Sequence, residues 1–354
     1  MTTDPLPAGI DAERLTLALR RCGVLDDGRV RDIAVANSFP TILSQIVRLR
    51  LTYNGPAPRA PASLILKTGH PQRAVTSWNS GQREVAFYTQ AAPATPAGLL
   101  LRCFGAEWDA GTNAWHLLLE DLTDSHHIAT TWPLPPPDGQ CESMVRTLAR
   151  FHAAWWDDPR LGASVGAWFD DAATAEQMRG LAAQFGRFVD LVGDRLSSER
   201  RALYERLIDA APRLLERYRS RRHATIVHGD AHVWNYLMPN PGGAGGVRLF
   251  DWDAWHIDTA SDDLAYMMAT HWYPERRSRL EKPLLDLYHR EIMAHGVAGY
   301  GRQALQDDYR LSTLWLMTRP VGQAVNNLPP VIWWNNLERI MLAVDDLGCR
   351  ELLG

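Results

Sequence analysis

The first third of the chain alternates apolar and polar residues in the manner of β-strands. Between Ile42 and Tyr53, the apolar residues Val47, Leu49 and Leu51 fall on one face, and polar residues lie between them. Because side chains on a strand point alternately to its two sides, this segment is expected to bury one face in a sheet. Similar patterns predict further strands over residues 30–36, 62–67, 99–106 and 115–119.

From about residue 140 onward, apolar residues recur at the spacing of helices, as Met144, Leu148, Phe151 and Trp155 do. Helical patterns continue over residues 171–222, 274–295, 302–323 and 332–347. A chain of 354 residues is long enough for two lobes. We therefore predict an α+β fold with a small β-rich N-terminal lobe, a hinge and a larger helical C-terminal lobe. The expected bounds are residues 1–119, 120–123 and 124–354.

The composition narrows the possible classes of partner and compartment. The formal net charge of −4 offers no basic surface, so nucleic-acid binding is not expected. The N-terminus lacks the charged and apolar regions of a secretory signal, and no apolar run is long enough to span a membrane. We therefore expect a cytoplasmic protein with no membrane partner. The four cysteines could pair, but they lack C-x-x-C spacing and are expected to be thiols.

The stretch from Ile226 to Asp253 concentrates polar side chains that can do chemistry. Asp230 and Asn235 lie in its first half, and Asp251 lies near its end. A segment rich in Pro and Gly separates two short apolar runs, which predicts two strands joined by a tight reversal. Such a hairpin can bring Asp230, Asn235 and Asp251 to one end. Their oxygen atoms suit Mg²⁺, and a carboxylate that does not bind the metal can accept the proton of an attacking hydroxyl.

Two other interpretations of this stretch are possible. His228 and His232 stand four residues apart, as two zinc ligands on a helix would. Gly229 and the β-like residues around it disfavour a helix, however, and no third ligand is evident in the sequence. The second alternative is a polar loop with no chemical role, because glycine-rich connections between strands are common.

The spacing of the polar residues matches that of a kinase catalytic loop. Asp230 and Asn235 are separated like the Asp and Asn of that loop, and Asp251 takes the place of the metal-binding Asp of D-F-G. The sequence H-G-D-x-H-x-x-N followed by D-W-D resembles the aminoglycoside phosphotransferase and choline kinase-like small-molecule kinases, including their ecdysteroid kinase-like branch. The resemblance implies a protein kinase-like two-lobe fold, with Asp230 as the catalytic residue and Asn235 and Asp251 as ligands of Mg²⁺. It also implies that Asp263, in an Asp-Leu-Ala triplet, supports the catalytic loop.

The resemblance further indicates how the nucleotide is held. Lys67 ends a predicted strand and Glu84 lies in the next predicted helix, the order of the lysine and glutamate that position the phosphates in kinases. The glycine-rich loop of kinases has no counterpart here, so the predicted phosphate contacts are hydroxyl or backbone groups of Ser38, Thr41 and Ser44.

The segment that links the two predicted lobes is expected to contact the base of the nucleotide. In the resembled family, the backbone of this segment pairs with the adenine edge. Glu120 and Leu122 occupy the corresponding positions in this chain. We therefore assign them to nucleotide binding through their backbone groups.

Together these features predict transfer of the γ-phosphoryl group of ATP, with Mg²⁺, to the hydroxyl of a small-molecule acceptor. A catalytically silent, nucleotide-binding pseudokinase or scaffold is the alternative, although a scaffold has no need of the complete set of catalytic residues. Many acidic residues in the helical lobe would suit an aminoglycoside, and aromatic boxes would suit choline. This lobe has plenty of Trp and a balanced share of Arg, so neither pattern prevails. We therefore favour an apolar alcohol as the acceptor.

Overall fold

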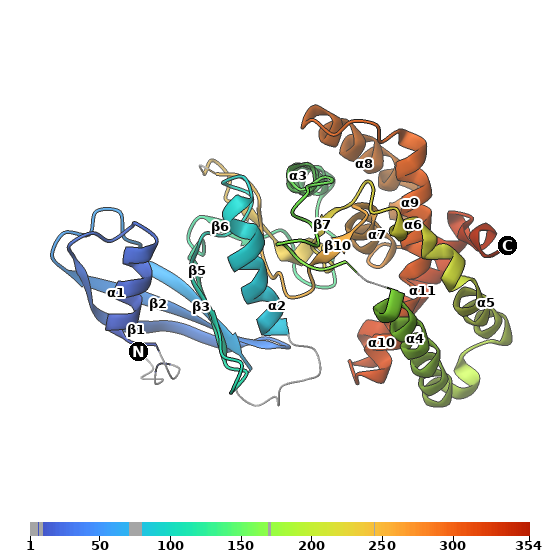
Figure 1. Cartoon of the computed structure of the whole chain (residues 1–354), viewed down its shortest axis with the longest axis horizontal. Helices are drawn as coiled ribbons and strands as arrows, with labels where there is room; N and C mark the ends of the chain where they lie inside the picture. The colour runs from blue at the N-terminus through green and yellow to red at the C-terminus, as the bar shows by residue number, and fades with distance from the viewer. Residues whose placement is uncertain (1–5, 7–9, 71–79, 169–170, 244) are drawn as a thin grey trace. The chain divides into compact units, whose positions relative to one another are not determined.

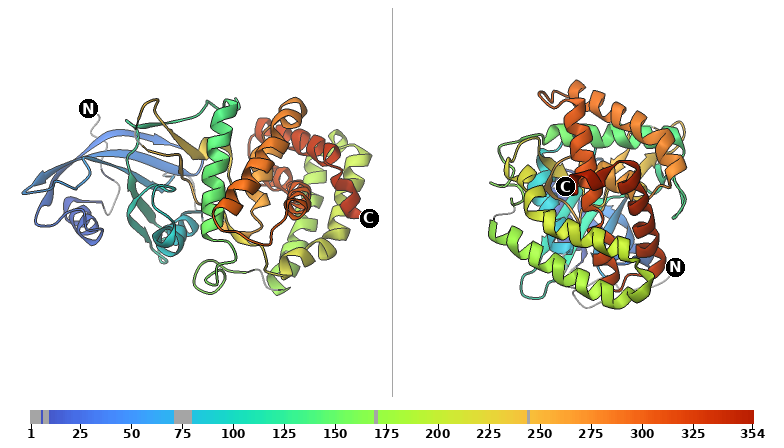
Figure 2. Two further views of the ribbon diagram at one scale, coloured as in Figure 1. Left: turned by 90° about the horizontal axis from the view of Figure 1, so that it is seen from above. Right: turned by 90° about the vertical axis from the view of Figure 1, so that its right-hand side faces the viewer.

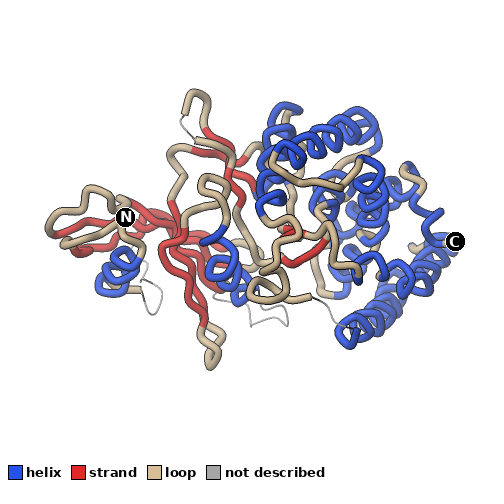
Figure 3. The backbone as a smooth tube through the Cα atoms, turned by 45° about the horizontal axis from the view of Figure 1, so that its top comes forward, coloured by secondary structure: helices blue, strands red, loops and turns tan. Residues whose placement is uncertain are grey.

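The chain is described by a computed structural model over residues 6, 10–70, 80–168, 171–243 and 245–354. It forms two compact units (Figure 1). The first comprises Met1–His127 and Leu237–Ala254, and the second comprises Ile128–Tyr236 and Trp255–Gly354. Strands dominate the first unit and helices the second (Figure 3), which confirms the predicted α+β architecture. The lobe bounds and the hinge at residues 120–123 stay predictions.

A five-stranded antiparallel sheet with the strand order β1-β2-β3-β5-β4 forms the core of the first unit. As predicted, Val47, Leu49 and Leu51 on β2 are buried. The prediction was wrong for the end of β1, because this strand continues to Pro40 and stays paired with β2. The strands are β1 (Arg29–Pro40), β2 (Ser44–Asn54), β3 (Ser63–Gly69), β4 (Cys103–Trp108) and β5 (Trp115–Glu120).

Two helices of the first unit pack against this sheet, and strand alternation separates their contacts. Helix α1 (Ala12–Arg21) contributes Leu15 and Leu19 to a core that also contains Leu64 and Leu66 of β3. Because side chains alternate along a strand, Lys67 points to the opposite side from Leu64 and Leu66. There it meets α2 (Ser80–Ala86), which continues into a π-helix (Phe87–Ala91) and a 3₁₀ turn (Ala92–Ala94).

The hairpin predicted from the sequence is present. Strands β8 (Tyr236–Pro239) and β9 (Arg248–Leu249) are joined by the segment rich in Pro and Gly. They form a three-stranded sheet with β6 (His126–Ile128), in the order β6-β8-β9. Only Phe250 separates Asp251 from the end of β9, so the sheet fixes where the chain that carries this carboxylate leaves the strand.

The second unit is built from helices around a short antiparallel pair, β7 (Thr225–Val227) and β10 (His256–Asp258). Helix α3 packs against α8, α7 against α9, and α10 against both α4 and α11. Figure 2 shows that helices, coloured green through red, make up most of this unit. Within the described ranges, none of the helices has the length and apolar character needed to cross a membrane. The α-helices are α3 (Asp138–Ala154), α4 (Asp171–Val192), α5 (Ser198–Leu214), α6 (Glu216–Arg219), α7 (Ser261–Ala269), α8 (Pro274–Ala294), α9 (Arg302–Trp315), α10 (Thr318–Val325) and α11 (Pro330–Asp346). The 3₁₀ helices of this unit are Gly193–Arg195, Val233–Asn235 and Cys349–Leu353.

All four cysteines lie within the described part of the chain, and none of them forms a disulfide. Cys141 and Cys349 are buried, and Cys22 donates its Sγ–H to the carbonyl oxygen of Phe104 at 3.3 Å. Burial raises the pKa of Cys103 and of Cys349 to about 12, so these two groups are thiols at neutral pH.

Candidate active site

Lys67 lies at the centre of a cluster of ion pairs in the first unit. Its Nζ is 2.5 Å from Oε2 of Glu84 and 2.5 Å from Oδ1 of Asp251. Three segments that are distant in sequence therefore meet at one ammonium group: β3, α2 and the chain after β9. The ion pair between Lys67 and Glu84 that the resemblance implied is present, and Asp251 joins it. The roles of these residues toward a nucleotide stay predictions.

The electrostatics of this cluster keep Lys67 charged. Burial acts to lower the pKa of Lys67, but the carboxylates of Asp251, Glu84 and Asp253 outweigh it, and its pKa is raised. Burial raises the pKa of Glu84, and the charge of Lys67 opposes that rise. Lys67 is only 7% exposed and Glu84 only 1%, whereas the side chain of Asp251 is 38% exposed. One ammonium thus faces several carboxylates, and Asp251 can offer an oxygen to a cation from solution.

The conformation of Asp251 is fixed by the residue that follows it. Asp251 has φ of 69°, in the left-handed region that few residues other than glycine adopt. Trp252 is fully buried and stacks on Phe87 with ring centroids 3.9 Å apart. Its backbone N–H also donates to Oε1 of Glu84 at 3.3 Å. The D-W-D motif therefore uses its tryptophan to hold Asp251 beside the helix that carries Glu84.

The second unit carries the loop of Asp230 and Asn235. The side-chain amide of Asn235 donates to the carbonyl oxygen of Asp230 at 2.8 Å and to its Oδ2 at 3.3 Å. The backbone N–H of His232 donates to the same carbonyl oxygen at 2.7 Å. Because the amide nitrogen of Asn235 is used in this way, its amide oxygen is the atom suited to binding a cation.

Asp230 is held as a carboxylate. Burial acts to raise its pKa, but nearby His232, a hydrogen bond from Tyr266 and the charge of Arg319 outweigh that effect, and the pKa of Asp230 is lowered. Its side chain is 28% exposed, and Oδ2 lies 3.4 Å from Nε2 of His232. An ionised, accessible carboxylate is the form that can accept a proton from a hydroxyl.

Asp263 on α7 holds the loop of Asp230 in place through hydrogen bonds to its backbone. Asp263 accepts hydrogen bonds from the backbone N–H groups of His228 at 2.7 Å and Gly229 at 2.8 Å. It also lies 3.0 Å from Nε2 of His152, whose Nδ1 is 2.9 Å from the hydroxyl of Tyr288. Asp263, His152 and His228 are all fully buried. This geometry gives Asp263 the supporting position that the resemblance implied.

We expect replacement of Asp263 with alanine to lower the free energy of unfolding by roughly 3–5 kcal/mol. The change leaves buried donors without an acceptor, each at a cost of about 1–3 kcal/mol. Urea unfolding of the whole chain measures the effect. The matched control is Asp307→Ala on the exposed surface of α9, where a change within about 0.5 kcal/mol is expected. Equal urea midpoints for the two variants would contradict the anchoring role.

Two residues that contact this loop were missed in the sequence. Arg319 donates to the carbonyl oxygen of Gly229 at 2.6 Å, and its guanidinium lies 4.8 Å from the ring centre of Tyr266. Tyr266 in turn donates a hydrogen bond to Asp230. Both residues belong to helices well after the loop in sequence, and no local motif marks them. Only the packing of α7 and α10 brings them to Asp230.

The arrangement does not suit the zinc interpretation of His228 and His232. His228 follows β7, and His232 precedes the 3₁₀ helix at Val233–Asn235, so the two do not share a helix. Among the residues that the structure describes, no group of three or more His, Cys, Asp or Glu side chains is placed to hold a metal ion.

The predicted phosphate loop over residues 36–44 is mostly strand, which corrects the sequence-based interpretation. Ser38 lies within β1, and its hydroxyl accepts a hydrogen bond from Gln45. Thr41 Oγ1 accepts from the N–H of Ser44 at 3.0 Å and closes a tight turn. Ser44 is also buried, at 5% exposure. Phosphate contacts by Ser38, Thr41 and Ser44 stay predictions.

The linker residues already use part of their backbone hydrogen-bonding capacity. The N–H of Glu120 donates to the carbonyl oxygen of Arg102 at 2.8 Å. The carbonyl oxygen of Leu122 accepts from Ser125 and His126 at 3.0 and 2.9 Å. An adenine contact at Glu120 and Leu122 therefore stays a prediction that would rely on the carbonyl of Glu120 and the N–H of Leu122.

His271 should make stability depend on pH. It packs among the rings of His232, Trp234 and Tyr266, and burial lowers its pKa to about 3 from 6.5. Between pH 6.5 and 3, His271 is protonated in the unfolded chain but stays neutral in the folded chain. The free energy of unfolding therefore falls as the pH is lowered through this window, and His271 does not affect it above pH 6.5. We expect a slope of up to about 1.4 kcal/mol per pH unit.

The measurement is the difference in unfolding free energy between the parent and His271→Gln at several pH values. Glutamine can still donate to the carbonyl oxygen of Tyr266, which lies 2.9 Å from Nδ1 of His271, but it does not titrate. Subtracting the two curves removes the contribution of other groups. A difference that is flat from pH 7 to 4 would refute the prediction.

Comparison with known proteins identifies the family and the fold of this chain. Residues 41–296 match the ecdysteroid kinase-like family, and the chain belongs to that family. No curated protein matches the chain at significant sequence similarity. The resemblance drawn from the H-G-D and D-W-D motifs is thereby confirmed.

Solved structures share the fold along nearly the whole chain. A Ralstonia eutropha protein classed as an aminoglycoside phosphotransferase superposes with a TM-score of 0.60 at 14% identity, covering 97% of this chain and 98% of that one. Choline kinase from Cryptosporidium parvum gives 0.54 at 12% identity, covering 90% and 89%. A point mutant of an aminoglycoside 2′-phosphotransferase in complex with GDP gives 0.52 at 12% identity, covering 95% and 96%. These similarities confirm the protein kinase-like fold.

Proposed function

We propose that this protein is a kinase that transfers the γ-phosphoryl group of ATP to a hydroxyl of a small molecule. The observation that carries the proposal is Lys67 held, fully charged, between Glu84 and Asp251. A lysine oriented in this way is suited to binding the phosphates of a nucleotide. Membership of the ecdysteroid kinase-like family and the GDP complex of a structural relative support a nucleotide substrate.

Each named residue has a distinct task in this proposal. Asp230 orients the acceptor hydroxyl and takes its proton, as its lowered pKa and partial exposure allow. Lys67 binds phosphate oxygens, and Ser44, Glu120 and Leu122 contribute nucleotide contacts. Asn235 and Asp251 hold Mg²⁺, which neutralises phosphate charge when bound. Oxygen donors and the surplus of carboxylates around Lys67 fit this metal.

An uncharged alcohol suits the surroundings of Asp230 better than a polycation does. The side chains whose charges act most strongly on Asp230 include His232, Arg319 and His228, which are neutral or positive. A polycationic aminoglycoside would meet like charge from Arg319 beside the base. We therefore propose an apolar alcohol as the acceptor class.

The decisive experiment incubates the purified protein with ATP or GTP, with Mg²⁺ or EDTA, and with a sterol, an aliphatic alcohol, choline and an aminoglycoside. We expect mass spectrometry to find one added phosphate on a hydroxyl acceptor, only with Mg²⁺ and not with Asp230→Ala. Nucleotide binding without phosphorylation of any acceptor would favour the silent pseudokinase. Failure to bind either nucleotide would overturn the proposal.

A further inference from the structure

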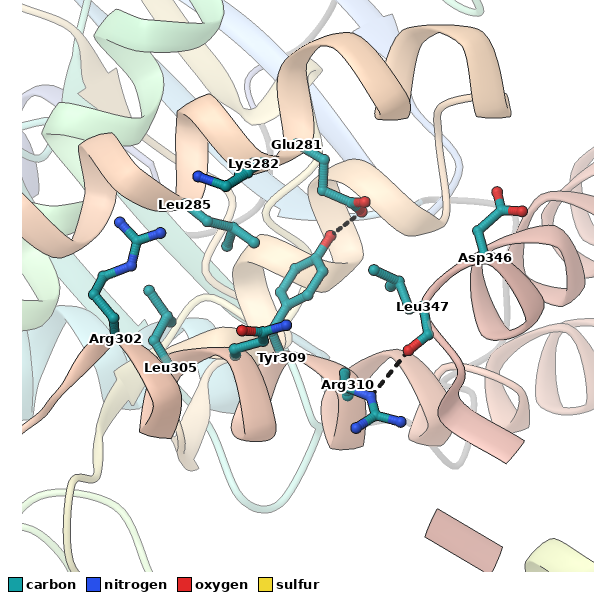
Figure 4. Close-up of a pocket in the computed structure, with 10 residues that line it drawn as sticks. Glu281, Lys282, Leu285, Arg302, Leu305, Tyr309, Arg310, Asp346 and Leu347 are labelled. Carbon is teal, nitrogen blue, oxygen red and sulfur yellow. Dashed lines mark hydrogen bonds between the residues drawn. The ribbon is translucent and has the colours of Figure 1, made fainter. Parts of the chain in front are cut away.

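A cavity of about 290 Å³ lies between α8 and α9, next to the C-terminal end of α11 (Figure 4). It belongs entirely to the second unit, and none of the residues assigned to phosphoryl transfer lines it. Pockets that bind small molecules usually measure about 300–1,000 Å³. At about 290 Å³ the cavity lies just below this range, so it suits only a small ligand.

One end of the cavity carries more positive than negative charge. Lys282 on α8 lies 2.9 Å from Asp286, and Arg302 at the start of α9 pairs with the same carboxylate. Two cations thus share a single counter-ion. Both remain reachable from solvent, since the side chain of Lys282 is 80% exposed and that of Arg302 is 46% exposed. An anion bound at this end would neutralise the positive charge that Asp286 leaves unbalanced.

The carboxylates that line the cavity are already paired. Glu281 accepts a hydrogen bond from the hydroxyl of Tyr309 at 2.6 Å and lies 3.8 Å from Arg277. Asp346 forms an ion pair with the same arginine, which is only 2% exposed. Burial also raises the pKa of Glu281. Two carboxylates thus share one buried cation here, so the excess of positive charge is confined to the end of the cavity at Lys282 and Arg302.

Apolar side chains lie beside the two cations. Leu285 and Leu305 occupy the same side of the cavity as Lys282 and Arg302 in Figure 4. Leu305 is 1% exposed, so it forms a fixed wall rather than a mobile surface side chain. An apolar group placed against these leucines would leave water, which is favourable in proportion to the area buried.

We propose that this cavity binds a small organic carboxylate, whose apolar body packs on Leu285 and Leu305 and whose charge pairs with Lys282 and Arg302. The proposal concerns a second ligand site and does not depend on the kinase reaction. Exposed ion pairs contribute little individually, so binding in the millimolar range is expected.

The test uses three probes with the same ring and different charge: benzoate, benzyl alcohol and benzylamine. Calorimetric titration of the full chain should show saturable benzoate binding, and benzylamine should bind at least roughly tenfold more weakly. Replacing both Lys282 and Arg302 with glutamine should remove the preference for benzoate. Equal binding of the three probes, or no saturable binding up to about 10 mM benzoate, would overturn the proposal.

A matched pair of variants locates the site. Gln306 lines the cavity from the exposed surface of α9, so Gln306→Trp should block benzoate without disturbing the core. Gln303 is also exposed on α9 but does not line the cavity, so Gln303→Trp should bind benzoate like the parent. Retention of benzoate binding by Gln306→Trp, or its loss in Gln303→Trp, would place the ligand elsewhere and refute this assignment.

Discussion

Replacing Asp230 with alanine is expected to lower kcat for phosphoryl transfer by a factor of about 10²–10⁴. Asp230 is ionised, partly exposed and held by Asn235, so its loss removes the group that orients the acceptor hydroxyl and takes its proton. The nucleotide should still bind, because the phosphate contacts assigned to Lys67 lie in the other unit. Steady-state kinetics and a separate nucleotide titration measure the two effects.

Asp230→Asn is the conservative control for this prediction. It keeps the size of the side chain and an oxygen that can accept from Tyr266, but it cannot act as a base at neutral pH. We expect its kcat to be close to that of the alanine variant. If the asparagine variant kept a substantial fraction of parental kcat, Asp230 would be a positioning group and not the base.

Replacing Lys67 with methionine is expected to lower both stability and activity. The change leaves Glu84 and Asp251 without their shared cation in a largely buried place, and breaking such a cluster costs about 3–5 kcal/mol. Loss of a positioned positive charge on the phosphates should lower kcat by roughly 10²–10³. Urea unfolding of the full chain gives the first number, and kinetics under folding conditions gives the second.

Two further variants separate the effect of Lys67→Met on stability from its effect on activity. Lys282→Met removes a lysine whose side chain is 80% exposed, and it should leave the free energy of unfolding within about 0.5 kcal/mol of the parent. The double variant Lys67→Met with Glu84→Gln removes both partners and should recover part of the lost stability, without recovering activity. A single Lys67→Met variant as stable as the parent would show that the cluster contributes nothing to folding.

Local sequence patterns were sufficient to predict the strands and the candidate site residues. Alternation along β2 predicted its buried face, because that face is set by the two-residue repeat of a strand. The order of Lys67 and Glu84 also led to their ion pair, because the kinase motif places a lysine and a glutamate there, whereas the contact of Asp251 with Lys67 was not predicted. Such signals lie in residue identity and spacing, which the sequence records directly.

The features that the sequence did not predict depend on contacts between segments that are distant in sequence. The polar run after Val35 suggested a loop, yet β1 continues because Phe39 pairs with Ile46 and Pro40 with Gln45 across the ladder to β2. Residues 36–40 of β1 are exposed or half-buried, so their polar side chains remain in contact with solvent. Arg319 and Tyr266 reach Asp230 only through helix packing, which no local pattern specifies.

The anchoring of the Asp230 loop by Asp263 has a consequence for protein engineering. The shape of this loop depends on α3 through His152 and on α7 through Asp263, and both lie outside the loop itself. A peptide or graft of residues 226–239 would carry the motif but leave the N–H groups of His228 and Gly229 without their acceptor. Transplanting the motif into another scaffold therefore requires its two supporting helices as well, so the smallest transferable piece is discontinuous in sequence.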